Sequence, residues 1–379
     1  MAAGSLQIGK IYDIPLLLHW SLLLIIPLFA WIIGVQIEVT ARLVAGIFQV
    51  PINSLALLNQ GLYPYIWGSI VAVGLFVGVL IHELAHSILA KRKGLKINSI
   101  TLFILGGVSN IENDVPDPRI ELPMSLAGPL TSLGLGVISI ALMYGGAFLI
   151  PNPQYQGVWV FVWGYLGLLN VVLFGFNILP AFPMDGGRVL RAWLAERMPL
   201  QRATQYAVNV GKGFAVIFGI FGFIIFNPIL IIIAFFIYIA ANQESTQLRY
   251  NVLLKDAKVE DVMSKTVTTV TPETPLMDLV RTMYTTKHLG YPVIENDTIV
   301  GMVTLDDVHK ISDEQRETGQ VKDVMTHEVV TLPPSAPLVD ALRVMSTRNI
   351  GRIPVVKDGV LVGIVTRTDI MRLMELREG

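Results

Sequence analysis

Residues 66–90, IWGSIVAVGLFVGVLIHELAHSILA, decide the fold of this chain. The stretch is mostly apolar and exceeds the about 20 residues that a membrane-crossing helix needs. Close to its end it carries His82, Glu83 and His86, three ionisable side chains that are costly to place in lipid. The stretch is therefore predicted to be a transmembrane helix with a functional site near one end.

Charged residues divide the chain into two parts. Residues 1–250 contain only 13 basic and 10 acidic side chains, whereas the shorter segment 251–379 contains 15 and 19. The first part has too few charges for a water-exposed surface, so we expect a membrane domain followed by a soluble domain. The net charge of −1 gives no support for a nucleic-acid partner. The absence of cysteine excludes a thiolate nucleophile and a cysteine-ligated metal.

Four apolar runs are long enough to span a membrane, and they cover roughly residues 14–35, 66–90, 122–150 and 157–179. A fifth apolar stretch, 213–241, contains Asn227-Pro228 near its centre. Because proline interrupts a helix, this stretch is predicted to be a hairpin, which gives about six spans in total. A single tilted span is the alternative.

Basic residues set the expected orientation, since they gather on the cytoplasmic side of a membrane. They precede the first run and follow the second and fourth runs, and the residues are Lys10, then Lys91, Arg92, Lys93 and Lys96, then Arg188, Arg191, Arg197 and Arg202. The segments that follow the first and third runs contain a single basic residue, Arg42. We therefore expect a multi-pass plasma-membrane protein of a bacterium or archaeon. Its N-terminus, its site and, with the hairpin, its C-terminal tail would be cytoplasmic.

The segment His82-Glu83-Leu84-Ala85-His86 has the form H-E-x-x-H. On a helix, side chains four positions apart share one face, so both imidazoles can reach one metal ion. The glutamate between them can then take a proton from a water molecule at that ion. Chance, or two histidines bonded to neighbouring helices, is the alternative.

A catalytic zinc ion needs a third protein ligand. The fourth run is followed by residues 177–188, NILPAFPMDGGR, in which Pro180 and Pro183 break the helix before Asp185. The break can aim the Asp185 carboxylate at a fixed point. An ordinary helix N-cap is the alternative for this aspartate. The H-E-x-x-H motif ends on the same membrane face, which favours a ligand.

The two motifs together, separated by 91 residues from His86 to Asn177, resemble those of the site-2 proteases, which are intramembrane zinc metalloproteases. The resemblance covers roughly residues 10–245, and we take 1–245 as the protease domain. It implies that one Zn²⁺ per chain is held by His82, His86 and Asp185, with Glu83 as general base and proton shuttle. It also places Asn177 close by, where it can hydrogen-bond the tetrahedral intermediate. Bonding of Asn177 to another helix is the alternative.

The resemblance further implies regulated intramembrane proteolysis, in which peptide bonds in or near transmembrane segments of single-pass membrane proteins are hydrolysed. Residues 97–114, INSITLFILGGVSNIEND, have a strand-like composition. Family members place a short membrane-dipping β element here, and we expect its edge to bind an extended substrate. A surface loop is the alternative. His19 can approach the metal but is not counted as a ligand, and Gly128-Pro129 is interpreted as a close-packing and kink position.

The C-terminal third is an internal repeat. Residues 261–308 and 323–370 align without a gap at an offset of 62, and GMVTLDD at 301–307 matches GIVTRTD at 363–369. Two copies of a strand–helix–strand–strand–helix unit predict an α/β pair related by a pseudo-twofold axis.

This repeat resembles a tandem of cystathionine-β-synthase (CBS) domains, with boundaries at 257–312 and 320–376. The family typically binds adenine nucleotides between the two units, so ATP or AMP is the expected regulatory ligand. The resemblance implies that Asp307 and Asp369 bond ribose and that Thr304 and Thr366 meet phosphate. A module for homo-oligomer formation without a ligand is the alternative, because Thr and Asp also cap helices well.

A protease regulated by nucleotide level is the function that these features favour. A transporter or channel with a regulatory tail would need polar groups along several spans, whereas here they gather at one end. A catalytically inactive receptor is disfavoured because the H-E-x-x-H motif and Asp185 are both intact.

Overall fold

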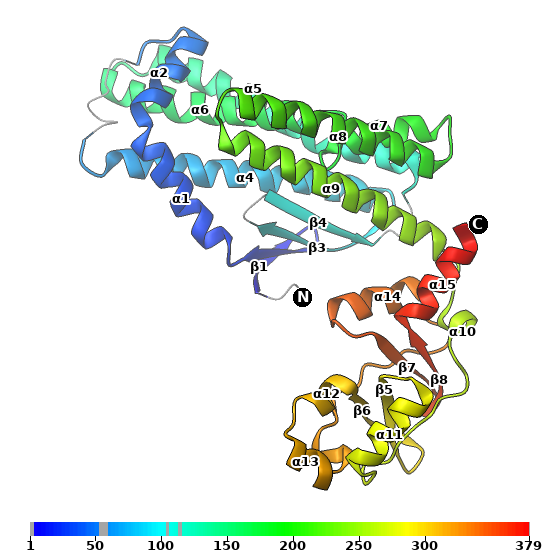
Figure 1. Cartoon of the computed structure of the whole chain (residues 1–379). Coiled ribbons are helices and arrows are strands. Elements are labelled where there is room, and N and C mark those ends of the chain that lie inside the picture. The colour runs from blue at the N-terminus through cyan, green and yellow to red at the C-terminus, as the bar shows by residue number, and fades with distance from the viewer. Residues whose placement is uncertain (1–3, 53–59, 104–105, 113–115, 379) are drawn as a thin grey trace. The chain divides into compact units, whose positions relative to one another are not determined.

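The computed structural model describes residues 4–52, 60–103, 106–112 and 116–378 (Figure 1). The chain forms two compact units, Met1–Leu248 and Arg249–Gly379. The first unit combines long helices with a four-stranded sheet, and the second contains two small two-stranded sheets with short helices.

Five helices of the described chain are long and apolar enough to cross a membrane, and they are α4 (Tyr63–Arg92), α5 (Pro118–Leu149), α6 (Pro153–Asn177), α8 (Leu200–Ile224) and α9 (Pro228–Leu253). The helices α1 (Leu22–Val35) and α2 (Ile37–Phe48) meet at 74° and together could provide a sixth span. The prediction of about six spans is thus confirmed. The stretch 213–241 is divided between α8 and α9, as the hairpin requires, and Asn227 Oδ1 accepts a hydrogen bond from the Leu230 amide at 3.1 Å.

The prediction of a helix from residue 14 is wrong. Ile14–His19 forms strand β2, which pairs with β1 (Ser5–Ile11) on one side and with β3 (Lys96–Phe103) on the other. A short apolar run is compatible with a buried strand as well as with a helix, and periodicity alone cannot separate them. Here the two neighbouring strands decide in favour of a strand, and the helix begins only at Leu22.

The strand order in the sheet is β1-β2-β3-β4, with β4 spanning Gly106–Glu112. Strands β3 and β4 are antiparallel, with Thr101 opposite Val108 and Ile100 opposite Ser109. The β element predicted between the second and third apolar runs is therefore present. Strand β4 lies at the edge of the sheet, and it packs against α4.

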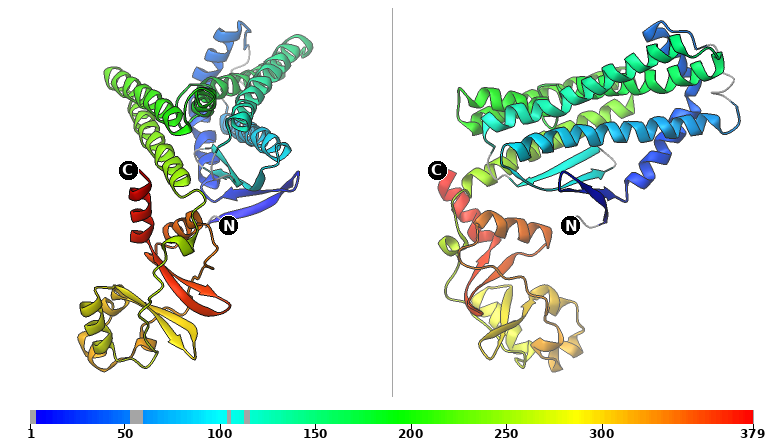
Figure 2. Two further views of the ribbon diagram at one scale, coloured as in Figure 1. Left: turned by 90° about the vertical axis from the view of Figure 1, so that its right-hand side faces the viewer. Right: turned by 180° about the vertical axis from the view of Figure 1, so that it is seen from behind.

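Small residues bring the long helices close together. Helix α5 lies beside both α4 and α6 (Figure 2). A β-carbon at Gly136 of α5 would lie 3.3 Å from the Gly167 carbonyl oxygen of α6, which only a close backbone approach produces. Such small-residue contacts are typical of helices that pack within a membrane.

Part of the chain between α6 and α7 (Asp185–Ala195) is buried although it is not helical, whereas Pro180 in the same connection is exposed. Ala181 and Phe182 are fully buried, and they pack against side chains of α8 and α9. The buried part of this irregular segment is enclosed by protein, which is the condition under which non-helical backbone is tolerated at membrane depth.

The second unit contains two copies of one motif. Its elements are α10 (Val259–Val262), α11 (Leu276–Thr286), β5 (Gly290–Glu295), β6 (Thr298–Thr304), α12 (Leu305–His309), α13 (Asp313–Thr318), η1 (Val321–Asp323), α14 (Leu338–Thr347), β7 (Arg352–Lys357), β8 (Val360–Thr366) and α15 (Arg367–Glu378). The hairpins β5-β6 and β7-β8 have the same register, displaced by the repeat offset of 62.

The two copies exchange backbone bridges reciprocally. Ser264 of the first copy pairs with Ile364 of the second, and Met302 pairs with Thr326. At the axis, Arg352 donates to the carbonyl oxygen of Gly290, its equivalent in the first copy, at 2.9 Å. Burial lowers the pKa of the Arg352 guanidinium. These contacts have the pseudo-twofold symmetry that the repeat predicts.

Candidate metal centre

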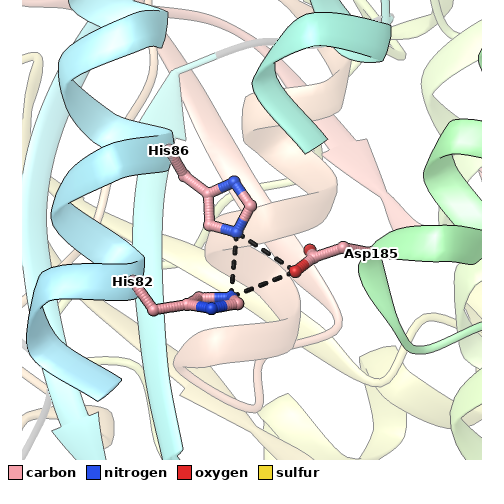
Figure 3. A group of neighbouring side chains, drawn as sticks. All are labelled: His82, His86 and Asp185. Atoms are coloured by element: carbon pink, nitrogen blue, oxygen red, sulfur yellow. Dashed lines mark hydrogen bonds and ion pairs between the residues drawn. The ribbon is translucent and has the colours of Figure 1, made fainter. Parts of the chain in front are cut away.

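Three side chains from two separate parts of the sequence converge at one point (Figure 3). His82 Nε2 and His86 Nε2 lie 3.1 Å apart, and each lies 3.1 Å from Asp185 Oδ2. The two histidines are on one face of α4, as the four-residue spacing requires. All three are at most lightly exposed, with side-chain exposures of 6%, 10% and 14%.

Helix α5 orients both imidazole rings through their other nitrogen atoms. His86 Nδ1 lies 2.6 Å from the Met124 carbonyl oxygen, which can only accept, so Nδ1 donates. His82 Nδ1 lies 2.9 Å from Ser132 Oγ. In the neutral imidazole this leaves Nε2 of His86 without a proton, so its lone pair is available to a metal ion.

This arrangement fits a zinc ion. Two imidazole nitrogens and a carboxylate oxygen are the donor types found in catalytic zinc sites. Ligand atoms bound about 2.0 Å from a tetrahedral ion lie about 3.3 Å from one another, close to the separations found here. Electron-rich atoms at this spacing repel one another unless a cation or a proton lies between them. Among the described residues, this is the one group of three that can hold a metal ion in this way.

Gly128 leaves the space in which the ligand atoms meet. A β-carbon at this position of α5 would overlap His86 Nε2 and lie 2.5 Å from His82 Nε2. Met124, Gly128 and Ser132 recur every four residues and so form one face of the helix. Interpretation of Gly128 as a packing position missed this role, because it depends on α5 lying against α4.

Glu83 lies beside the site and belongs to the same helix. Its Oε2 accepts a hydrogen bond from Ser109 Oγ of β4 at 2.8 Å, and Ser87 Oγ lies 3.0 Å from Ser109 Oγ. Gly107 of β4 packs so closely that a β-carbon there would overlap the Glu83 side chain. The edge strand of the sheet therefore positions the glutamate.

The sequence of the α6–α7 connection explains how Asp185 reaches the histidines. A β-carbon at Gly186 would overlap the Leu179 carbonyl oxygen, and one at Gly187 would lie 2.5 Å from the Phe182 nitrogen. Asp185 is the first residue of α7, and its Oδ2 lies 3.1 Å from Nε2 of both histidines. The Met184 position precedes the helix as its N-cap, so Asp185 is not the capping residue that the sequence allowed.

Two other residues singled out in the sequence have different hydrogen-bond partners. Asn177 ends α6, and its Nδ2 donates to the Leu173 carbonyl oxygen at 3.0 Å. The predicted role of Asn177 toward the reaction intermediate stays a prediction. His19 ends β2, where its Nδ1 lies 2.8 Å from Ser21 Oγ and its ring packs against Phe103. His19 is not a member of the metal-binding group.

In the second unit, each predicted nucleotide residue contacts its partner in the motif. Asp307 Oδ2 accepts from Thr304 Oγ1 at 2.6 Å, and Asp369 Oδ2 accepts from Thr366 Oγ1 at 2.7 Å. The same oxygens accept from the threonine amides at 3.0 Å, which caps the following helices. The second carboxylate oxygen of Asp307 accepts from Lys310 Nζ at 3.5 Å, so this aspartate has a basic neighbour as well as its capping contacts.

Comparison with known proteins gives the following similarities. A model of peptidase family M50 matches residues 70–152 and 145–220, and a model of the CBS domain matches 259–314 and 321–376. A zinc metalloprotease of Methanocaldococcus jannaschii is 36% identical over 92% of this chain and 95% of its own length. A Mycobacterium tuberculosis protein whose name places it among zinc metalloproteases is 29% identical over 98% of this chain and 93% of its own length. A solved structure described as a site-2 protease from M. jannaschii is 34% identical and covers 64% of this chain and 95% of that chain, with a TM-score of 0.42.

Proposed function

Since this chain belongs to peptidase family M50, the site-2 type of zinc metalloprotease, and carries a CBS pair, we propose that it performs intramembrane proteolysis. Its substrates would be single-pass membrane proteins, cleaved in or near their transmembrane segments. The observation that carries the proposal is the convergence of His82, His86 and Asp185 at 3.1 Å. The histidines lie on α4, which is apolar enough to cross a membrane, and Asp185 begins α7, which follows the apolar helix α6 in the chain.

In this proposal His82, His86 and Asp185 hold one zinc ion, and Glu83 is the general base. When bound, zinc would polarise the scissile carbonyl and lower the pKa of a water molecule to about 7. Glu83 would accept a proton from the attacking water as the water oxygen bonds to the scissile carbonyl carbon, and it would pass that proton to the amine as the C–N bond breaks. The Ser109 hydroxyl donates to the Glu83 carboxylate and so fixes its direction. Met124 and Ser132 hold the imidazoles so that Nε2 of each ring faces the metal.

The proposal predicts one zinc per chain and its loss in Asp185→Ala. The protein would be purified in detergent, zinc would be quantified, and cleavage of a model transmembrane peptide would be followed. Removal of one of three ligands should leave well under about a tenth of the wild-type zinc after dialysis, because a catalytic site has no spare protein ligand. Full zinc retention in Asp185→Ala would remove Asp185 from the site, and a zinc-loaded wild type without cleavage would refute proteolysis.

The free edge of β4 is the proposed binding place for the substrate backbone. A helical segment hides its peptide bonds, and a strand added to a sheet edge presents them in extended form. Strand β4 is the last strand in the sheet order, and its residue Ser109 contacts Glu83. Strand addition there would bring an extended substrate next to the general base.

Disulfide cross-linking would test whether an extended substrate binds along the edge of β4. The chain has no cysteine, so Val108→Cys introduces a single thiol at a position of β4 that is 56% exposed. Substrates with one cysteine at successive positions should cross-link with a period of two, because alternate side chains of a strand face the same side. A period of three to four would indicate a helical substrate and would exclude strand addition.

Adenine nucleotide is the proposed ligand of the CBS pair, with Asp307 and Asp369 toward ribose and Thr304 and Thr366 toward phosphate. The symmetric pairs support two sites. At 100 times its Kd, a ligand stabilises a folded unit by about 2.7 kcal/mol, so ATP or AMP should raise its Tm by several degrees. The double variant Asp307→Asn, Asp369→Asn keeps residues that cap helices and should lose this shift. An unchanged shift in the variant would place the nucleotide elsewhere, and no shift in wild type would favour a module for self-association only.

The proposed orientation places the N-terminus, the metal-site face and the C-terminal unit in the cytoplasm. Basic residues beside α4 and α7 support it, although Arg191, counted among them, is buried in an ion pair. A cysteine at exposed Ser312 should react with a membrane-impermeant maleimide only after the cells are lysed. Labelling in intact cells would show that the C-terminal unit lies outside the cytoplasm.

A further inference from the structure

Arg191 of α7 is a buried cation with two carboxylate partners. It is 3% exposed, and its Nε lies 3.1 and 3.2 Å from the two oxygens of Glu121 in the first turn of α5. Its Nη2 also bonds to Glu121, and its Nη1 lies 2.8 Å from Glu244 Oε1 of α9. The guanidinium thus joins three helices of the first unit at one point.

Burial of charged groups costs free energy. Apolar residues of similar volume would often stabilise a protein as much as a buried ion pair does. The planar guanidinium instead provides directional bonds that a lysine or an apolar side chain cannot reproduce. The network is therefore better explained by the fixed arrangement that its directional bonds give the three helices than by a gain in the stability of the fold.

The network leads to Asp185 through α7. Arg191 lies six positions after Asp185 in an 11-residue helix, and its guanidinium carbon is 4.9 Å from the centre of the Phe182 ring. Phe182 belongs to the buried connection that precedes Asp185. Arg191 therefore contacts the segment before the aspartate and anchors the helix after it.

The other end of the network is the helix that orients the histidines. Glu121 is one turn before Met124, whose carbonyl oxygen accepts from His86, and Ser132 lies further along α5. One helix thus fixes the imidazoles directly and fixes the aspartate by way of Arg191.

We propose that Arg191 is a positioning residue, which locks α7 to α5 and so holds the Asp185 carboxylate at its place between the two imidazoles. Glu244 includes α9 in the same lock. The inference rests on the proposed function only in taking His82, His86 and Asp185 as zinc ligands. It requires no substrate and no cleavage.

The test measures metal binding in the full-length protein in detergent. Arg191→Lys keeps the charge but loses the paired bonds to Glu121, and Glu244→Gln weakens only the link to α9. Arg42→Lys is the matched control, because Arg42 forms an exposed ion pair with Glu38 at 3.6 Å on α2. Zinc affinity would be determined by competition with a chelator, and the visible spectrum of the Co²⁺-loaded protein would report the ligand geometry.

Arg191→Lys should weaken zinc binding roughly 10- to 100-fold, as loss of groups that support metal ligands does. It should also shift the Co²⁺ spectrum, whereas Arg42→Lys should do neither. Glu244→Gln should have a smaller effect in the same direction. If Arg191→Lys does not fold, Glu121→Gln replaces it, since it removes the charge on the other side of the pair with little change in shape.

Wild-type zinc affinity and an unchanged Co²⁺ spectrum in Arg191→Lys, or in Glu121→Gln if that variant is used, would overturn the proposal. A lower Tm without either change would assign the network to stability alone and would overturn it as well. A wild type that binds zinc but cleaves no peptide would refute proteolysis and leave the positioning role standing, so the two failures can be told apart.

Discussion

Glu83→Gln is expected to abolish proteolysis and to leave zinc binding unchanged. An amide cannot accept the proton that a carboxylate takes, and loss of a general base typically lowers the rate about 10²- to 10⁴-fold. Glu83 is not among the three converging ligands, and its contact with Ser109 can persist because the amide oxygen also accepts. The substitution therefore separates the chemical step from metal binding.

The measurement compares the cleavage rate of a model transmembrane peptide with zinc content in wild type, Glu83→Gln and the control Glu38→Gln. Glu38 lies in α2 and pairs with Arg42 at a solvent- or lipid-exposed position. Both glutamine variants should bind one zinc, and only Glu83→Gln should be inactive. Cleavage by Glu83→Gln at the wild-type rate would exclude Glu83 as the base. It would reopen the transporter and receptor interpretations.

Sequence patterns located the three converging residues because each pattern is local. The histidines are four positions apart on one predicted helix, and Asp185 follows two prolines and precedes two glycines. Glycine is required at 186 and 187 because the neighbouring backbone fills the space of a side chain. Local rules of this kind act within a few residues, so they can be recognised without knowledge of the fold.

The supporting contacts could not be found in the same way. His86 is held by Met124 and His82 by Ser132, which are 38 and 50 positions away, and Arg191 bonds to Glu121 across 70 positions. Such pairs depend on which helices become neighbours, and a single sequence does not contain that information. Strand β2 was missed for the same reason, since only its pairing with β1 and β3 distinguishes it from the start of a helix.

Gly128→Ala is expected to remove zinc from the site. The added methyl group would overlap His86 Nε2 and lie 2.5 Å from His82 Nε2. The rings cannot simply turn away, because Met124 and Ser132 hold their Nδ1 atoms. Zinc affinity should fall by at least about 100-fold, the upper range for loss of groups that merely support the ligands, and cleavage should fall with it.

Helix propensity provides the control for this prediction. Alanine is favoured over glycine in a helix interior by up to about 1 kcal/mol, so a substitution without a clash should leave stability equal or higher. Gly134 lies in the same helix, and a β-carbon there would contact no atom within 4 Å. Gly134→Ala should therefore keep both zinc and activity. Gly128→Ala should have the lower Tm of the two without metal, because overpacking typically costs about 1–3 kcal/mol, so zinc affinity would be compared well below both Tm values. Equal zinc affinity in both would show that the rings have room to move, and that α5 orients the histidines less rigidly than their contacts indicate. Loss of zinc in Gly128→Ala alone would instead show that the absence of one methyl group on α5 is a requirement of the metal site, as much as the presence of its three ligands.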